Sequence, residues 1–498
     1  GEQAMNDATA ASSGVPVGAS TLPGTSPGTS LGASAEWPAG LLLAYYGDDF
    51  TGSTDALEVL AFAGLRCALF LKPPTRESLD RHGPLDAIGV AGDSRAMSPQ
   101  EMDRALPPVF DALAALGAPI VHYKVCSTFD SAPGVGSIGR VMELLRGRHA
   151  APFIPIVAGT PALGRWCLFG HLYARSGTDG RVYRLDRHPI MSVHPVTPMD
   201  ESDLARHLAR QAKLSIANLP YPTYDAGDAA ADAAWAALAA SGVDAVVLDA
   251  ASDADLTSVG RLLDQASRRH APVFVVGSSG AEYALTQWWR AQAGAAAPPL
   301  PEPGRVAGVD RVLAVSGSAS ALSARQIDAA VAAGFAELPV DAQALVDEVH
   351  GPRAAAALVE QATALLRQGR SVILHTARGP DDPRIGALIA ALQAQGLGRD
   401  EARLDGGRRL GVRLGDVTRE ILRAVPLQRL LLSGGDTSSQ VTQRLAPDAL
   451  VVAARLARGA PLCRFVGGPP GIDGLDVALK GGQMGDDGYF ESARRGHA

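Results

Sequence analysis

Short apolar runs alternate along most of the chain with longer stretches in which apolar residues recur every three or four positions. Continuous apolar runs of four to six residues are typical of strands buried on both faces of a parallel sheet. The runs that predict strands are 41–46, 87–91, 120–124, 154–157, 245–248 and 273–276, and helical stretches include 102–116 and 229–240. This alternation predicts an α/β protein with doubly wound sheets.

The first helix is predicted over residues 53–64. Ser53 or Thr54 is the expected N-cap, since short hydroxyl side chains accept hydrogen bonds from free N–H groups of the first turn. Gly64 is the expected stop.

The strand–helix alternation stops once and then resumes. Residues 291–308 are rich in Ala, Pro and Gly and contain AAAPPLPEPG, a composition typical of a linker. Strand-like runs return at 312–315, 372–375 and 430–432. We therefore predict two α/β lobes, 40–292 and 311–498, joined by a linker at 293–310, with a small-molecule site in the cleft between them.

The first 39 residues differ from the rest. They are mostly Gly, Ser, Thr, Ala and Pro. Such a segment buries too little apolar surface to offset its chain entropy, so we expect a disordered tail. It lacks the charged and apolar regions of a signal peptide.

Composition narrows the class of protein. The 498 residues carry a formal net charge of −7 with no long basic run, which argues against nucleic acid as a ligand. The four cysteines form no CxxC pair, so a zinc site or disulfide framework is not expected and a reducing cytoplasm fits. No apolar run approaches the roughly 18 residues of a membrane span.

The motif GDDFTG, residues 47–52, lies between the first predicted strand and helix. Ligands of doubly wound sheets bind at the carboxyl ends of strands. Asp48 or Asp49 could deprotonate or orient a hydroxyl there. The alternative, a simple turn and helix cap, is equally compatible with the residues.

Two further motifs follow strands of the first lobe. In GDSRAMSP, residues 92–99, Arg95 could bind a carboxylate bidentately, or it could be a surface arginine beside a capped helix. In the stretch 123–139, Lys124 ends a strand and is followed by Cys126 and Ser127. These polar groups suit an acidic, hydroxylated ligand, although an ordinary polar loop explains them as well. Cys126 has no His tied to it by spacing and is interpreted as a lining residue.

The second lobe carries three glycine-rich loops. They are SGSAS at 316–320, SGGDTSSQV at 433–441 and LKGGQMGDDGYF at 479–490. Glycines allow the backbone to approach a phosphate, and Asp436 could hold Mg²⁺ through water. Each loop alone is more often a turn, but three in one lobe favour nucleotide binding. There is no GxxxxGK[ST] sequence, which excludes a P-loop protein.

The histidines form no metal-binding pattern. His188 and His194 lie in a proline-rich stretch, and His375 ends a predicted strand. We interpret each as a hydrogen-bonded structural histidine.

Taken in order, these motifs resemble the four-carbon acid sugar kinase family. The resemblance covers nearly all of 41–490, and KVCSTFDS (124–131) and HPVTPM (194–199) are most similar to the branch that acts on 3-oxo-tetronates. It implies an ATP- and Mg²⁺-dependent kinase, with sugar acid bound by the first lobe and ATP by the second. The residues it implies are Asp48 and Asp49 as catalytic groups, Arg95, Lys124, Val125, Cys126 and Ser127 around the sugar acid, and Ser316, Ser318, Gly434, Gly435, Asp436, Thr437 and Gly482 around ATP.

The sequence departs from the family pattern at Gly47, at Cys126 and in the final KGGQMG motif. The first motif block also resembles branches that act on a branched 3-oxo acid derived from apiose or that are effector-like. We therefore expect a kinase of 3-oxo-tetronate, threonate or erythronate. The alternatives are a kinase of a branched acid such as 3-oxo-isoapionate and a non-catalytic binding protein. The expected partners are the sugar acid and ATP, without nucleic acid or membrane, and a homodimer could form.

Overall fold

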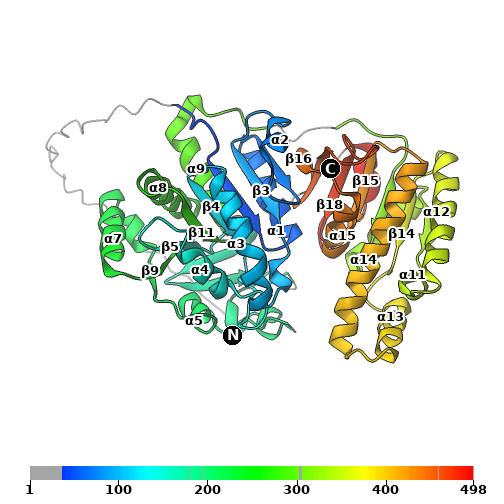
Figure 1. Cartoon of the computed structure of the whole chain (residues 1–498), viewed down its shortest axis with the longest axis horizontal. Coiled ribbons are helices and arrows are strands. Elements are labelled where there is room, and N and C mark those ends of the chain that lie inside the picture. Colours follow the sequence, from blue (N-terminus) through cyan, green and yellow to red (C-terminus); the bar gives the residue numbers. More distant parts are fainter. Residues whose placement is uncertain (1–35, 178, 195, 302–305, 458, 497–498) are drawn as a thin grey trace, which may run out of the picture. The chain divides into compact units, whose positions relative to one another are not determined.

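A computed structural model describes residues 36–498 apart from 178, 195, 302–305, 458 and 497–498 (Figure 1). Residues 1–35 of the predicted tail and 302–305 of the predicted linker lie outside this part. None of the described helices is both long and apolar enough to cross a membrane.

The first lobe contains eight parallel strands. Five of the six predicted strands there agree with the structure within one residue at each end; the first begins two residues later than predicted. In spatial order the strands are β2 (Cys67–Phe70), β3 (Ala87–Ala91), β1 (Leu43–Gly47), β4 (Ile120–Lys124), β11 (Val273–Gly277), β5 (Ile154–Val157), β10 (Ala245–Leu248) and β9 (Ile216–Leu219). All of β1, β2, β4, β5, β10 and β11 is buried, as expected for strands covered on both faces.

Helices cover both faces of this sheet, which confirms the doubly wound fold (Figure 1). The helices belong to two different hydrophobic clusters: α1 and α7–α9 contribute to one, and α3–α5 contribute to the other. The helices are α1 (Phe50–Phe62), α2 (Arg76–Asp80), α3 (Pro99–Ala115), α4 (Ile138–Arg146), α5 (Leu204–Ala209), α6 (Pro222–Asp225), α7 (Asp228–Ser241), α8 (Asp253–Arg269) and α9 (Gly280–Ala293). A small antiparallel sheet of β6 (Arg165–Leu168), β7 (His171–Arg175) and β8 (Val182–Arg184) is inserted after β5.

The second lobe has five parallel strands followed by two antiparallel ones. In spatial order they are β13 (Ala336–Pro339), β14 (Val372–His375), β12 (Leu313–Ser316), β15 (Arg429–Ser433), β18 (Asp476–Lys480), β17 (Ala460–Val466) and β16 (Ala449–Ala457). The helices are α10 (Ala321–Ala332), α11 (Ala342–Val346), α12 (Gly351–Arg367), α13 (Pro383–Ala394), α14 (Arg399–Ala424), α15 (Gly435–Leu445) and α16 (Tyr489–Arg495).

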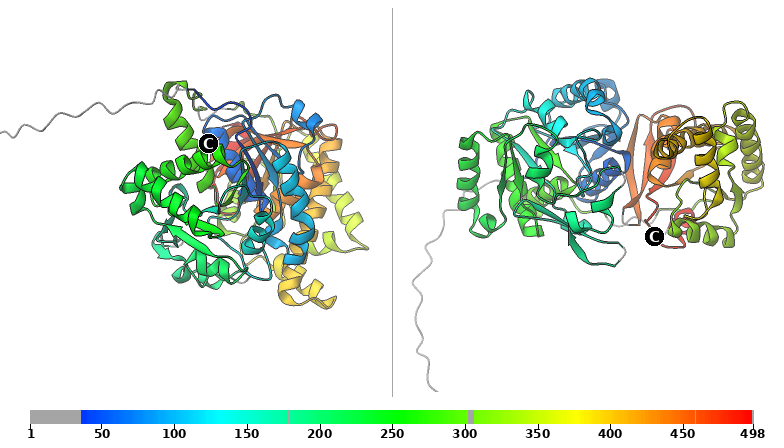
Figure 2. Two further views of the ribbon diagram at one scale, coloured as in Figure 1. Left: turned by 60° about the vertical axis from the view of Figure 1, so that its left-hand side comes forward. Right: turned by 90° about the horizontal axis from the view of Figure 1, so that it is seen from below.

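One continuous sheet links the two lobes, a feature that the sequence did not predict. Strand β16 pairs antiparallel with β2 through Ala449↔Phe70 and Leu450↔Leu69. The orange strands β16 and β17 therefore lie between the parallel strands of the two lobes (Figure 2). One hydrophobic cluster also includes residues from both lobes.

The prediction for the first helix was wrong at its start. Helix α1 begins at Phe50, three residues before the predicted start, and its N-cap is Asp49. Asp49 has an extended backbone and its carboxylate accepts a hydrogen bond from Gly52 N at 2.7 Å. Ser53, named as a cap, instead donates its hydroxyl to Asp49 O at 2.6 Å inside the first turn. Aspartate is among the preferred N-cap residues, and Asp49 precedes Ser53, so the helix begins earlier than predicted.

Candidate active site

The polar motifs of the first lobe meet at the carboxyl end of β1. Gly47 and Lys124 are paired in register on β1 and β4, and Asp48 N donates to Lys124 O at 2.8 Å. Asp48 and Lys124, 76 positions apart in the sequence, are therefore neighbours in the fold. Parallel pairing produces this, because equal register brings strand ends to one edge.

Arg95 joins both aspartates of the GDDFTG motif. Its Nη2 lies 2.8 Å from Asp48 Oδ1 and its Nε lies 3.1 Å from Asp48 Oδ2. Its Nη1 donates to Asp49 Oδ2 at 2.7 Å. Asp48 is buried, whereas the Asp49 side chain is 29% exposed and also caps α1. Both carboxylates thus face the same guanidinium, and Arg95 is not a free surface arginine.

The Asp48 carboxyl has a perturbed pKa. Its pKa is raised to about 6. Burial is the main cause; the nearby Asp49 also raises the pKa, whereas Arg95 lowers it. Loss of hydration disfavours the charged form, and the ion pair with Arg95 offsets only part of this effect. A carboxyl with a pKa near 6 accepts a proton more readily than an ordinary aspartate.

Lys124 is buried beside a third carboxylate, Asp55, which the sequence reasoning missed. Its Nζ lies 3.5 Å from Asp55 Oδ2. Burial lowers the pKa of Lys124, but Asp55, Asp49 and Asp48 outweigh it, so the net pKa is raised. The only signal for Asp55 was its place in the helix that follows the GDDFTG motif, and Glu58 in the same helix shared that signal.

The loop after β4 carries the other predicted substrate-binding residues. Val125 is buried and its N donates to Gly277 O at 2.7 Å, while Ser127 is half-buried. Cys126 Sγ lies 3.0 Å from Thr128 Oγ1. Burial raises the pKa of the Cys126 thiol to about 11, so it is protonated at neutral pH and is no nucleophile.

Three strand ends form a polar row in the second lobe. Ser316 of β12, Ser433 of β15 and Lys480 of β18 are paired in register. Within the described part of the chain, the buried hydroxyls of Ser316 and Ser433 have no hydrogen-bond partner. Buried polar groups are seldom left without one, so such groups indicate a ligand site.

The three glycine-rich loops converge above this row. Ser320 Oγ donates to Gly482 O at 2.5 Å, which ties the first loop to the third. A Cβ at Gly317 would overlap Thr437 Oγ1, so the first loop also lies directly against the second. Gly434 has φ +110°, a backbone conformation that favours glycine. The residues predicted around ATP are therefore brought together, with Ser318 beside Gly482.

Lys480 is a further residue that the sequence reasoning did not single out. The sequence has four lysines, and the two that are buried, Lys124 and Lys480, each end a strand at a candidate site. Lys480 Nζ donates to Gly481 O at 3.0 Å and forms no ion pair within the described residues. Burial lowers its pKa to about 8.

The motifs of the two lobes lie against each other. A Cβ at Gly435, the first residue of α15, would be 3.1 Å from Thr51 Oγ1 in the first turn of α1. The N-termini of two helices therefore meet, each presenting free N–H groups and the positive end of its dipole. Asp436 lies in the first turn of α15.

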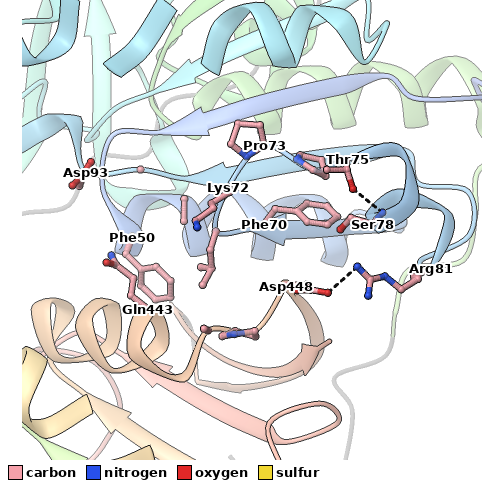
Figure 3. Close-up of a pocket in the computed structure, with 16 residues that line it drawn as sticks. Phe50, Phe70, Lys72, Pro73, Thr75, Ser78, Arg81, Asp93, Gln443 and Asp448 are labelled. Atoms are coloured by element: carbon pink, nitrogen blue, oxygen red, sulfur yellow. Dashed lines mark hydrogen bonds and ion pairs between the residues drawn. The ribbon is translucent and has the colours of Figure 1, made fainter. Parts of the chain in front are cut away.

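A pocket of about 610 Å³ opens beside this contact (Figure 3). Phe50 and Asp93, next to the aspartates and Arg95, line it from the first lobe, and Gln443 and Asp448 line it from the second. Two of its lining residues, Arg81 and Asp448, form an ion pair between the lobes at 3.0 Å. The pocket is lined by residues of both lobes, but none of the residues predicted to bind the sugar acid or ATP lines it.

The histidines named from the sequence are hydrogen-bonded. His188 Nδ1 accepts from the backbone of Ile190 and Met191, and His194 Nδ1 accepts from Thr197. His375 is within 3.0 Å of Glu337 and Arg384.

The chain matches two protein families, one in each lobe. A sugar-binding N-terminal domain matches residues 43–285, and a nucleotide-binding C-terminal domain matches residues 313–490. The chain belongs to the four-carbon acid sugar kinase family, which confirms the resemblance found in the motifs.

Two relatives and one solved structure are similar to the chain over nearly their whole length. The chain is 45% identical to a 3-oxo-isoapionate kinase of Paraburkholderia graminis, over 92% of this chain and 95% of that protein. It is 32% identical to a 3-oxo-tetronate kinase of Pseudomonas fluorescens, over 91% and 96%. A solved protein of Salmonella typhimurium LT2 has the same fold, with a TM-score of 0.73 at 24% identity, over 92% of this chain and 99% of that one.

Proposed function

We propose that this protein transfers the γ-phosphoryl group of ATP to a hydroxyl of a 3-oxo sugar acid, with a branched acid of the 3-oxo-isoapionate type as the preferred substrate. The sequence alone favoured a 3-oxo-tetronate and kept the branched acid as the alternative. The higher identity to a 3-oxo-isoapionate kinase, 45% against 32%, supports reversing that order.

The contact between the helix N-termini carries the proposal. Thr51 and Gly435 bring the motif with the aspartates against the loop that suits phosphates. Phosphoryl transfer demands little covalent chemistry from a protein and depends on positioning and on neutralising charge. Two helix N-termini that face the same space favour the negative charge of a phosphoryl group in transit.

The residues for ATP fit a polyphosphate. Among the described residues, the buried hydroxyls of Ser316 and Ser433 have no hydrogen-bond partner, and the buried Lys480 ammonium contacts a carbonyl but no carboxylate, so phosphate oxygens could accept from all three. The backbone at Ser318, Gly434, Gly435, Thr437 and Gly482 would line the phosphates. Asp436 is the acidic residue that would hold Mg²⁺ through water, and the ion would neutralise phosphate charge when bound.

In the chemical step, the aspartates act on the hydroxyl group of the sugar acid that accepts the phosphoryl group. Asp48, buried and with a pKa of about 6, takes the hydroxyl proton while the hydroxyl oxygen forms a bond to the γ-phosphorus. The bond from this phosphorus to the bridging oxygen breaks, and ADP leaves. Arg95 fixes the positions of Asp48 and Asp49, and Lys124, Val125, Cys126 and Ser127 border the sugar acid.

A coupled assay of ADP release tests the proposal. The purified chain would be offered 3-oxo-isoapionate, the 3-oxo-tetronates, threonate and erythronate with ATP·Mg²⁺. ADP release that depends on the branched acid, at the highest kcat/KM of the panel, supports the proposal. A higher kcat/KM for a tetronate restores the original order of substrates.

A non-catalytic binding protein is the alternative from another class. Melting curves with ATP·Mg²⁺ and with each acid separate the two, since any ligand that binds only the folded state raises the melting temperature. A kinase responds to both ligands. A protein that responds to the acid but not to ATP, and releases no ADP, would refute the kinase.

A further inference from the structure

The cations predicted to bind the substrate carboxylate are already occupied. Three nitrogens of Arg95 contact Asp48 and Asp49 at 2.7–3.1 Å. Lys124 lies near Asp55, and Asp48 and Asp49 also raise its pKa. Three carboxylates thus face two cations, a balance that repels a further carboxylate. The sugar acid needs another positive group.

Arg165 is a cation at the same end of the sheet that pairs with none of the carboxylates in the described ranges. It begins β6, and its backbone forms a bridge with Thr160, which follows β5. Its Nη1 donates only to carbonyl oxygens, those of Leu163, Gly164 and Arg175, at 3.0–3.4 Å. Its Nε is buried without any hydrogen-bond partner, and across the described residues it forms no ion pair.

The Arg165 side chain faces the loop that carries the predicted substrate-binding residues. Its charge interacts with Cys126 and Asp130, and Cys126 in turn interacts with Arg95. Because the Cys126 thiol is protonated at neutral pH, it neutralises neither arginine. Asp130 is the one carboxylate of the loop 126–130 whose charge acts on Arg165, and among the described residues it forms no ion pair with it.

A second unpartnered group lies on the segment that follows β11, which contacts the segment leading to Arg165. Ser279, the N-cap residue of α9, has a buried hydroxyl that finds no hydrogen-bond partner among the residues that the structure describes. A Cβ on the next residue, Gly280, would overlap Gly159 O, so the start of α9 touches the segment that leads to Thr160 and Arg165. An N–H donor and an O–H donor without partners thus belong to two segments that follow β5 and β11 and touch each other.

We propose that Arg165, rather than Arg95, binds the carboxylate of the sugar acid, with Ser279 as a second donor. This inference rests on the proposed function and specifies how the acid is recognised. The carboxylate supplies the acceptor that the Arg165 Nε lacks and the negative charge that compensates a partly buried guanidinium. Arg95 is left to position the two aspartates at the reacting hydroxyl.

Three variants test the assignment. Arg165→Gln removes the charge, Arg165→Lys keeps the charge without the planar fork, and Arg175→Gln is the control from the same small sheet, where Arg175 is exposed and stacks on Trp166. Charge-assisted hydrogen bonds predict a rise of about 100-fold in the KM for the acid in Arg165→Gln and about 10-fold in Arg165→Lys. The KM for ATP and the behaviour of Arg175→Gln should stay as in the wild type.

A neutral substrate analogue distinguishes recognition from a merely structural role. In the matching polyol a CH₂OH group replaces the carboxylate. The wild type should prefer the acid, and Arg165→Gln should lose that preference. Equal losses for acid and polyol, or an unchanged KM for the acid, would overturn the assignment.

The variants remain decisive if Arg165→Gln does not fold. Ser279→Ala should then raise the KM for the acid several-fold while leaving the KM for ATP unchanged, and no change in Arg165→Lys or Ser279→Ala refutes the subsite. A wild type that releases no ADP with any acid is a failure of the proposed function. A working wild type with an unaffected Arg165→Gln is a failure of this inference alone.

Discussion

At the scale of single residues, burial rather than sequence position gives the candidate groups their chemistry. Asp48 and Asp49 are adjacent, yet Asp48 is buried, which raises its pKa to about 6, whereas the Asp49 side chain is 29% exposed. Lys124 and Lys480 both end buried strands, but carboxylates surround Lys124, whereas Lys480 has none in ion-pair contact in the described chain. The same residue type therefore has opposite pKa shifts in the two lobes.

Asp48→Asn is expected to lower kcat by about 10²–10⁴-fold, the usual contribution of a general base. The base must be unprotonated. Wild-type kcat/KM should therefore fall tenfold per pH unit below about pH 6 and level off above it. Steady-state rates from pH 5 to pH 8 measure this. Asp103→Asn, at a surface pair with Arg140, is the control and should keep both the rate and the acid limb.

Lys480→Met is expected to weaken ATP binding about 10- to 100-fold, as loss of a charge-assisted phosphate contact implies. Bound phosphate favours the ammonium form, so wild-type protein should take up protons when it binds ATP near pH 8. Calorimetry in buffers of different ionisation enthalpy detects this uptake. Lys213→Met, an exposed lysine, should leave it unchanged. Persistent uptake in Lys480→Met would exclude Lys480 as its source.

At the scale of secondary structure elements, the site is built from strand ends and the helix starts that follow them. Asp49 caps α1, and the turn from β15 into α15 at Gly434 places Asp436 and Thr437 at the next helix start. These elements carry short loops, so their polar side chains are held close to rigid backbone. The loops approach closely because their glycines have no Cβ, and neighbouring atoms occupy the space that a Cβ would need.

Gly317→Ala tests that approach. The added methyl would overlap Thr437 Oγ1, so the first loop has to move away from the second. We expect at least a tenfold rise in the KM for ATP and a loss of about 1–3 kcal/mol in the free energy of unfolding. Gly386→Ala is the matched control, since Gly386 is exposed inside α13 and a Cβ there meets nothing within 4 Å. Gly386→Ala should raise the free energy of unfolding by about 0.5–1 kcal/mol. Equal effects of the two substitutions would show that the close approach at Gly317 does not matter.

At the scale of the whole described chain, the lobes share a sheet and part of a core. Besides the β2–β16 pairing, Glu58 of α1 and Arg455 of β16 form an ion pair at 2.9 Å across the lobes. The Glu58 side chain is buried, and the Arg455 guanidinium also lies 4.0 Å above the Phe62 ring. A shared sheet and core predict that the two lobes unfold together.

Arg455→Gln should therefore destabilise both lobes. It leaves the Glu58 carboxylate buried without its cation, and since the Arg455 side chain is 40% exposed we expect a loss of about 1–2 kcal/mol. Calorimetry should show one transition at a lower temperature. Arg408→Gln, at an exposed pair within α14, should change the melting temperature little. Two separate transitions in the wild type would refute the shared core as the unit of folding.

Much of the fold and part of the site followed from the sequence. Buried strands are continuous apolar runs, so β3, β4 and β5 were predicted with their observed ends. The motifs that follow strands were found because strand ends and glycines are local signals. Asp49 was a candidate from the same signals, and the alternative interpretation of its motif as a turn and helix cap agrees with its position, although Ser53 or Thr54 was named as the N-cap.

The sequence by itself determined the α/β class, the two lobes, the family and which loops carry polar groups, because these depend on local periodicity and on motifs. Only the tertiary structure decided that Arg95 is shared by Asp48 and Asp49, that Asp55 lies beside Lys124, and that Arg165 and Lys480 form no ion pair with any carboxylate of the described chain. Those facts depend on which charges are brought together and shielded from water. These charge arrangements depend on burial and on pairing between residues that are distant in the sequence. A local sequence pattern predicts neither.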